Sequence, residues 1–173
     1  MSEYEFVEKP FLDQLAALDW QVIDQGAAFP TDPAKSLHPD FRTIVLRDIF
    51  NQSVRSINQT DDGQPWLTDK QLDDLHDLVI HQPGHSVLEV NEETLKLLFR
   101  GNRKGTIEVN ELTGEEYPDA NLIDFKRPLH NHFLAINQFR IDTPGGVKEC
   151  IIPDIVLFVN GLPLVVIECK DAS

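Results

Sequence analysis

The segment PDIVLFVNGLPLVVIECK, residues 153–170, is the part of the chain that most strongly indicates its fold. Two apolar runs, Ile155–Val159 and Leu164–Ile167, flank an Asn-Gly dipeptide, the strongest short-range signal of a tight β-hairpin. Charged residues stand at the open end of this hairpin, where Asp154 begins the first strand and Glu-Cys-Lys ends the second. Isolated charges are costly to bury beside apolar strands, so this arrangement indicates a function.

The register of the hairpin decides whether its acidic residues meet. A strict two-residue turn would put Asp154 and Glu168 on opposite faces of the sheet, because side chains alternate along a strand. A type I turn with Gly161 in a bulge would instead pair Phe158 with Leu162 and bring both carboxylates onto one face. We therefore predict a bulged hairpin with Gly161 at positive φ.

A divalent metal would explain the charges at the open end. Asp154 and Glu168 can supply carboxylate ligands for Mg²⁺, and the backbone carbonyl of Cys169 can add a third. Lys170, expected on the same face as Glu168, would orient or deprotonate the attacking water or stabilise the developing anion. The alternative from composition alone is a sheet end that is simply solvated.

A second Asp-x-Lys sequence, Asp124-Phe125-Lys126, follows the apolar pair Leu122-Ile123. Its nearest upstream acidic partner is Asp119, which is too close along the chain to leave room for a hairpin. We therefore interpret this copy as a strand end that meets solvent.

Helices dominate the first half of the chain and strands the second, which predicts an α/β fold with a mixed central β-sheet flanked by helices. On the first helix, Phe11, Leu12, Leu15 and Leu18 recur at helical spacing, and Glu8 precedes them by one turn. The predicted helices are Tyr4–Leu18, Phe41–Ile57, one capped by Thr68 and running to Val79, and one capped by Asn91 over Glu92–Phe99. The predicted strands are Trp20–Ile23, Thr106–Val109, Asn121–Phe125, Phe133–Ile141, Glu149–Val159 and Leu164–Lys170.

The composition indicates one soluble domain over residues 1–173. No apolar run approaches the ~20 residues needed to span a bilayer, and the acidic N-terminus lacks a secretory signal, so we expect a cytoplasmic protein without membrane contact. Two cysteines can form neither a disulfide framework nor a four-ligand zinc site. The formal net charge of −14 argues against a simple nucleic-acid binder, because phosphate contacts are made by clustered Lys and Arg.

The same segments resemble a known nuclease family. PDIVLFVNGLPLVVIECK is similar to the PD-(D/E)xK nuclease group, and in particular to the N-terminal endonuclease domain of type I restriction enzyme R subunits. The stretches NLIDFKRP and NHFLAINQFRID resemble the preceding strands of that domain, and EKPFLDQLAALDW resembles its first helix. The resemblance is densest from Asn121 onward.

The resemblance implies a restriction-endonuclease-like core and Mg²⁺-dependent cleavage of double-stranded DNA, without sequence recognition by this domain. It makes Asp154 and Glu168 metal ligands and Lys170 the catalytic lysine, and it maps the acidic residue of the first helix onto Glu8 as a further metal ligand. The alternative for Glu8 is an ordinary polar residue near a helix start. The implied partners are ATP-driven, helicase-like motor domains of the same subunit and separate modification and specificity subunits.

Two departures bear on activity. A Gln-x-x-x-Tyr motif usually follows the catalytic lysine in this family and is missing here, so we expect the chain to be the N-terminal part of a larger R subunit. No Gly-x-x-x-x-Gly-Lys-Ser/Thr phosphate loop occurs, so ATP would act only through motor domains outside this chain. The second hypothesis is a catalytically silent docking module that links the motor to the modification and specificity core.

Overall fold

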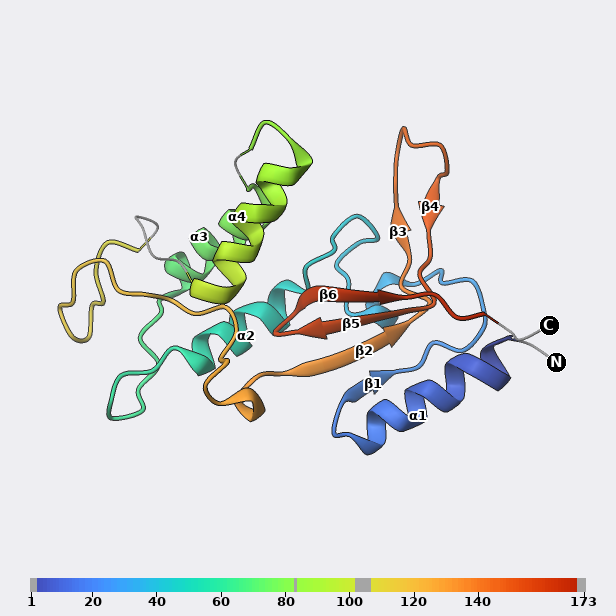
Figure 1. Cartoon of the computed structure of the whole chain (residues 1–173), viewed down its shortest axis with the longest axis horizontal. Helices are drawn as coiled ribbons and strands as arrows, with labels where there is room; N and C mark the ends of the chain where they lie inside the picture. The colour runs from blue at the N-terminus through green and yellow to red at the C-terminus, as the bar shows by residue number, and fades with distance from the viewer. Residues whose placement is uncertain (1–2, 83, 102–106, 171–173) are drawn as a thin grey trace. The chain divides into compact units, whose positions relative to one another are not determined.

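The computed structural model divides into two compact units. The Asn-Gly hairpin belongs to a four-stranded mixed sheet in the first unit (Figure 1). The structure describes residues 3–82, 84–101 and 107–170. Unit 1 comprises residues 1–46 and 133–173, and unit 2 comprises residues 47–132. In the described part of the chain, no helix is both long and apolar enough to cross a membrane.

The sheet of unit 1 has the strand order β1-β2-β5-β6. β1 runs parallel to β2, whereas β2, β5 and β6 form antiparallel neighbours, which confirms the predicted α/β class and mixed sheet. A second, two-stranded sheet is formed by β3 and β4. The strands are β1 (Gln21–Ile23), β2 (Phe133–Asn137), β3 (Ile141–Asp142), β4 (Cys150–Ile151), β5 (Ile155–Val159) and β6 (Leu162–Ile167).

The N-terminal helix packs on the sheet through its apolar stripe. A π-helical turn, η1 (Tyr4–Glu8), leads into α1 (Lys9–Ala17), as predicted for this segment. Leu12 and Leu15 are buried in a cluster with β2, β5 and the segment after β6. The prediction for Leu18 was wrong: the helix ends at Ala17, and Leu18 is 70% exposed. A short 3₁₀-helix, η2 (Pro33–Ser36), follows later in the same unit.

The β5–β6 hairpin has a tight turn followed by a bulge. Asn160 and Gly161 have φ values of 53° and 77°, which two central residues of a type I′ turn require. The positive φ of Gly161 was predicted, but Leu162 pairs with Val159 and not with Phe158. The register shifts farther along, between Leu157 and Phe158.

Proline explains where the register shifts. Pro163, the partner of Phe158, has no N–H to donate to the ladder, and prolines in sheets are confined to edge strands and bulges. Leu157 pairs next with Val165, so Leu164 is the extra residue.

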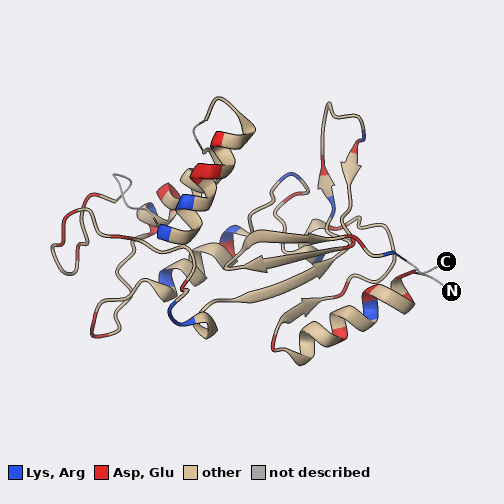
Figure 2. Ribbon diagram, in the orientation of Figure 1, with Lys and Arg blue, Asp and Glu red and all other residues tan. Residues whose placement is uncertain are grey.

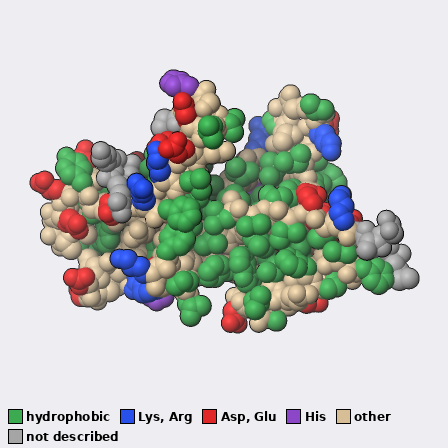
Figure 3. Space-filling view, viewed as in Figure 1, with side chains coloured by type: hydrophobic (Ala, Val, Ile, Leu, Met, Phe, Trp, Pro, Cys, Tyr) green, Lys and Arg blue, Asp and Glu red, His purple; other side chains and the backbone are tan. Residues whose placement is uncertain are grey.

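The side chains of Leu164, Val165 and Val166 in β6 are exposed at 40%, 46% and 60%, and Figure 3 shows hydrophobic side chains gathered over the sheet.

Three predicted strands differ in extent from the observed ones. The segment predicted over Phe133–Ile141 breaks at Gln138, whose φ of 49° lies in the left-handed region. The segment predicted over Glu149–Val159 is interrupted between β4 and β5. The final strand begins at Leu162 and ends at Ile167, three residues before the predicted Lys170.

Unit 2 contains three helices within the described residues: α2 (Arg47–Ile57), α3 (Asp69–Ile80) and α4 (Val87–Arg100). The predicted capping box of α3 is confirmed, because Thr68 and Gln71 exchange side-chain and backbone hydrogen bonds. α2 and α3 pack together, with Phe50 against His76 at a ring-centroid distance of 5.7 Å. A 3₁₀-turn, η3 (Pro128–His130), precedes β2.

Two helix starts differ from the prediction. Residues 41–46 are not helical, because Asp40 accepts hydrogen bonds from the backbone N–H groups of Arg42 and Thr43 and forms a local turn. α4 begins at Val87, upstream of the predicted cap at Asn91, because the Ser86 hydroxyl accepts from the N–H of Glu89.

The predicted strand over residues 121–125 does not form, because side chains satisfy the backbone there. Asn58 accepts from the N–H of Asn121 and donates to its carbonyl, at 2.8 Å each. Asn131 makes the same pair of contacts with the backbone of Asp124, at 2.8 and 2.9 Å. In the segment predicted as Thr106–Val109, residues 102–106 lie outside the described residues, and Val109 forms only an isolated bridge with Glu116.

Candidate active site

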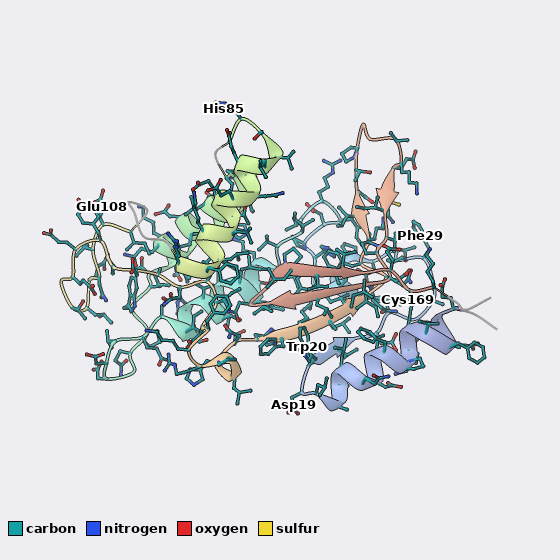
Figure 4. All side chains as sticks on the ribbon, viewed as in Figure 1. Asp19, Trp20, Phe29, His85, Glu108 and Cys169 are labelled. Carbon is teal, nitrogen blue, oxygen red and sulfur yellow. The ribbon has the colours of Figure 1, made fainter. Side chains whose placement is uncertain are left out.

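One hydrogen bond joins the charged ends of the hairpin strands. The backbone N–H of Cys169 donates to Oδ2 of Asp154 at 2.6 Å. Ile155 pairs with Ile167 in the last pair of the ladder, and Asp154 and Glu168 are the next residues outward on the two strands. Figure 4 labels Cys169 at this end of the sheet, and Figure 2 shows acidic segments where β5 begins. The two predicted carboxylates therefore lie at the same end of one hairpin.

The bulge produces this alignment. With the observed two-residue turn and a regular ladder, Asp154 would stand opposite Ile167, one position out of step with Glu168. The extra residue, Leu164, shifts the pairing by one, so that Ile155 pairs with Ile167 and a continued ladder would set Glu168 opposite Asp154. The predicted bulge exists, but it lies in β6 and not at Gly161.

Glu8 is the third acidic residue at this end, and the first helix turns it inward as its position on the apolar stripe predicted. It is only 4% exposed, and both carboxylate oxygens accept from Nε2 of Gln138, at 3.3 and 3.1 Å. Burial raises the pKa of Glu8, and the negative charge of Asp154 raises it further. The hydrogen bond from Gln138 acts in the opposite direction and lowers this pKa. The charge of Asp154 therefore disfavours the ionised form of Glu8.

Carboxylates surround the thiol of Cys169. Burial raises the pKa of this thiol, and the negative charges of Asp154, Glu8, Glu3 and Glu168 raise it further. The side chain itself packs in the apolar cluster against α1. A buried thiol in acidic surroundings is inert, so Cys169 contributes its backbone and its packing rather than a nucleophile.

The remaining predicted residues lie just past β6. Glu168 and Lys170 are both exposed, on either side of the buried Cys169. Among the described residues, no three His, Cys, Asp or Glu side chains stand together in a group that could hold a metal ion. The assignment of Asp154, Glu168, Cys169 and Glu8 as metal ligands therefore stays a prediction.

The donor chemistry nevertheless fits a hard divalent cation. Mg²⁺ prefers carboxylate and carbonyl oxygens, which is what Asp154, Glu8 and the Cys169 backbone offer. A cation between these groups would relieve the repulsion that Asp154 exerts on the buried Glu8.

A family comparison identifies the chain. The model of the family described as type I restriction enzyme R protein N terminus matches residues 1–173, the whole sequence. The chain belongs to this family. It is thus the N-terminal domain of a restriction enzyme R protein.

Two relatives carry related names. The R-protein domain is 30% identical over 165 residues to the type I restriction enzyme HindI endonuclease subunit of Haemophilus influenzae, covering 95% of this chain and 14% of that protein. It is 25% identical over 138 residues to a protein of Methanocaldococcus jannaschii, provisionally named type I restriction enzyme MjaIXP endonuclease subunit, covering 80% of this chain and 12% of that protein. The chain therefore spans about a seventh or less of the length of these relatives.

The second Asp-x-Lys sequence of this R-protein domain holds a loop together. Asp124 Oδ1 accepts from the backbone N–H groups of Lys126 and Arg127, and Oδ2 accepts from Nε of Arg127 at 2.9 Å. These contacts lower the pKa of Asp124 although burial opposes them. Asp124 is 9% exposed and sits in no strand, so its interpretation as a solvated strand end was wrong.

Gln138 is the residue at the site that the sequence did not point out. It lies in the NHFLAINQFRID segment, directly after the apolar run of β2. A polar Asn-Gln pair that ends a buried strand was the available signal.

Proposed function

We propose that this domain is the Mg²⁺-dependent endonuclease domain of a type I restriction enzyme, with a PD-(D/E)xK core that hydrolyses phosphodiester bonds of double-stranded DNA. The observation that carries the proposal is the open end of the hairpin: Ile155 pairs with Ile167, the Cys169 N–H donates to the Asp154 carboxylate, and Glu168 and Lys170 lie on either side of Cys169. Membership of the R-protein family supports it.

Each residue has a chemical role in this proposal. Asp154, Glu168 and the backbone carbonyl of Cys169 would hold Mg²⁺, and Glu8 would add a carboxylate ligand from the helix side. When bound, Mg²⁺ supplies an acidified water and charge stabilisation at the scissile phosphate. Lys170 would orient the attacking water or stabilise the anion that develops on the phosphate. The Cys169 N–H fixes Asp154 in place for this task.

The partners follow from the proposed role. The net charge of −14 gives this domain little affinity of its own for DNA, so most of the DNA contact would come from elsewhere. Helicase-like motor domains of the same subunit would move the DNA with ATP, and modification and specificity subunits would supply the recognition site. Such an assembly would act in the cytoplasm, on cellular or incoming DNA.

A silent docking module is the second candidate function. The acidic charge favours it, because an acidic face can dock on a basic partner. Pure docking gives no reason for an acidic pair in register at a strand end with a lysine beside it. Mg²⁺ binding that disappears in Asp154→Ala would distinguish the nuclease from the docking module.

Nicking of supercoiled plasmid in Mg²⁺ tests the proposal directly. The chain is compared with a version that continues past Ser173 by about one further domain, ~100 residues. Each is paired with a Lys170→Ala variant. Cleavage by the longer protein that is lost in its alanine variant supports the nuclease. If neither protein cuts DNA or binds Mg²⁺, the nuclease proposal is wrong and the docking module becomes the favoured function.

A further inference from the structure

Gln138 occupies a backbone position that needs support from its surroundings. It follows the last residue of β2, and its φ of 49° places a non-glycine residue in the left-handed region. Its N–H donates to the backbone carbonyl of Asp154 at 2.8 Å, and the N–H of Phe139 donates to the carbonyl of Pro153 at 3.2 Å. The turn at Gln138 thus holds the main chain of Asp154 from the side of β2.

A buried amide network fixes this turn. Nε2 of Gln25 donates to the carbonyls of Asn137 and Gln138, at 2.7 and 3.1 Å. The side chain of Asn137 is fully buried; it accepts from the N–H of Gln25 at 2.6 Å and donates to the carbonyl of Gly26 at 3.1 Å. Because its backbone is locked on both sides, the side chain of Gln138 starts from a fixed point.

The Gln138 side chain then reaches the helix. Its Nε2 lies 3.3 and 3.1 Å from the two carboxylate oxygens of Glu8, which is buried. An amide donor is neutral, so it orients the carboxylate and leaves its negative charge in place. A lysine or arginine at this position would instead neutralise that charge. Gln138 therefore contacts two of the acidic residues at once, Glu8 through its side chain and Asp154 through its backbone.

We infer that Gln138 is a positioning residue that aligns the Glu8 carboxylate with Asp154 for cation binding. The inference rests on the proposed metal-dependent function and adds a residue to it. Gln138 touches neither DNA nor the reacting atoms in this role. It acts by holding the Glu8 carboxylate and the main chain of Asp154 at a fixed separation.

The test measures metal binding, independently of cleavage. Gln138→Met keeps the length of the side chain and removes its donor, and the Mg²⁺ dissociation constant is determined by calorimetry, with Mn²⁺ as a spectroscopic probe. Loss of a group that orients a metal ligand typically weakens binding ~10- to 100-fold, and we expect at least ~10-fold here. The double variant Glu8→Gln/Gln138→Met should bind no more weakly than Glu8→Gln alone, because both changes remove the same oriented carboxylate.

Gln14→Met is the matched control. Gln14 is exposed on α1 and lies outside the amide network at the end of β2, so the same substitution there should leave metal affinity within about threefold. If folded Gln138→Met binds metal as tightly as the unmodified chain, or if the two losses simply add, the inference is wrong and the proposed function stands. An unmodified chain that binds no Mg²⁺ or Mn²⁺ overturns the proposed function and the inference together.

Discussion

Asp154 and Cys169 are joined across the hairpin by a 2.6 Å hydrogen bond from the Cys169 N–H to the Asp154 carboxylate. The donor lies after β6 and the acceptor before β5, so one bond fixes the open end of both strands. A carboxylate held by a backbone N–H is oriented before any ligand arrives. This preorganisation is what a first ligand of a metal site requires.

Asp154→Asn should separate the charge of this residue from its structural role. The amide oxygen still accepts from Cys169, but the negative charge is lost, so we expect Mg²⁺ affinity to fall by at least ~10-fold. In metal-free buffer the stability should stay within about 1 kcal/mol, because repulsion of Glu8 is relieved at the same time. Calorimetric titration and urea unfolding measure the two quantities. Asp13→Asn, at an exposed position of α1, is the control, and equal metal affinity in both variants would contradict the site.

Cys169→Ala should leave metal binding intact. The thiol packs with Leu12, Leu15 and Ala135, while the backbone makes the contact to Asp154. Loss of a small buried side chain is expected to lower the free energy of unfolding by ~1 kcal/mol. Metal titration and urea unfolding again give the two readouts. A drop in Mg²⁺ affinity like that of Asp154→Asn would mean that the sulfur itself is a ligand, against its buried, acidic surroundings.

Gly161→Val should loosen the hairpin on which the acidic pair depends. Gly161 has a φ of 77°, where a β-branched side chain is strained, so we expect ~1–2 kcal/mol of destabilisation. Its carbonyl also accepts from the N–H of Leu46 at 2.9 Å, which ties the turn to the segment before α2. Urea unfolding measures the loss of stability. The free energy of unfolding of Gly161→Ala should lie between those of the unmodified chain and of Gly161→Val. Unchanged stability in the valine variant would mean that the turn does not depend on this conformation.

The sequence predicted the hairpin because Asn-Gly between apolar runs is a local signal. It did not locate the bulge. The length of the turn and the extra residue of a bulge each shift the strand register, and only the combined shift decides which residues of the two strands pair. Pro163 was the local clue, since a proline cannot complete the ladder. The bulge does lie in this hairpin, at Leu164 and not at Gly161, and the alignment of Asp154 with Glu168 stays a prediction.

Features that depend on distant residues were harder to predict. The strand expected at residues 121–125 is absent because Asn58, 63 residues away, satisfies the backbone of Asn121. The side chain of Gln138 hydrogen-bonds Glu8, which is 130 residues away along the chain. By contrast, Glu8 was correctly placed inward, because helical spacing alone decides which side of a helix faces the core.

Protonation of His38 should lower the free energy of unfolding in mild acid. It is 4% exposed beside Phe139, at a ring-centroid distance of 4.1 Å, and Ser36 Oγ lies 2.9 Å from its Nδ1. Burial lowers the pKa of His38 from 6.5 to about 4, with the charge of Asp40 opposing the change. Because the folded pKa lies below the unfolded value, the stabilisation is complete above pH ~6.5 and is lost as the pH falls toward ~4.

This shift corresponds to ~3 kcal/mol of unfolding free energy between those two pH values. Urea unfolding over this range should therefore show a flatter acid limb in His38→Gln than in the unmodified chain. The variant is less stable at neutral pH, because the packing against Phe139 is lost, so the difference between the two proteins should shrink as the pH falls. His85→Gln, at an exposed position, should leave the acid limb unchanged. A constant difference between His38→Gln and the unmodified chain across the whole range would show that His38 charges equally easily in both states, which its burial opposes.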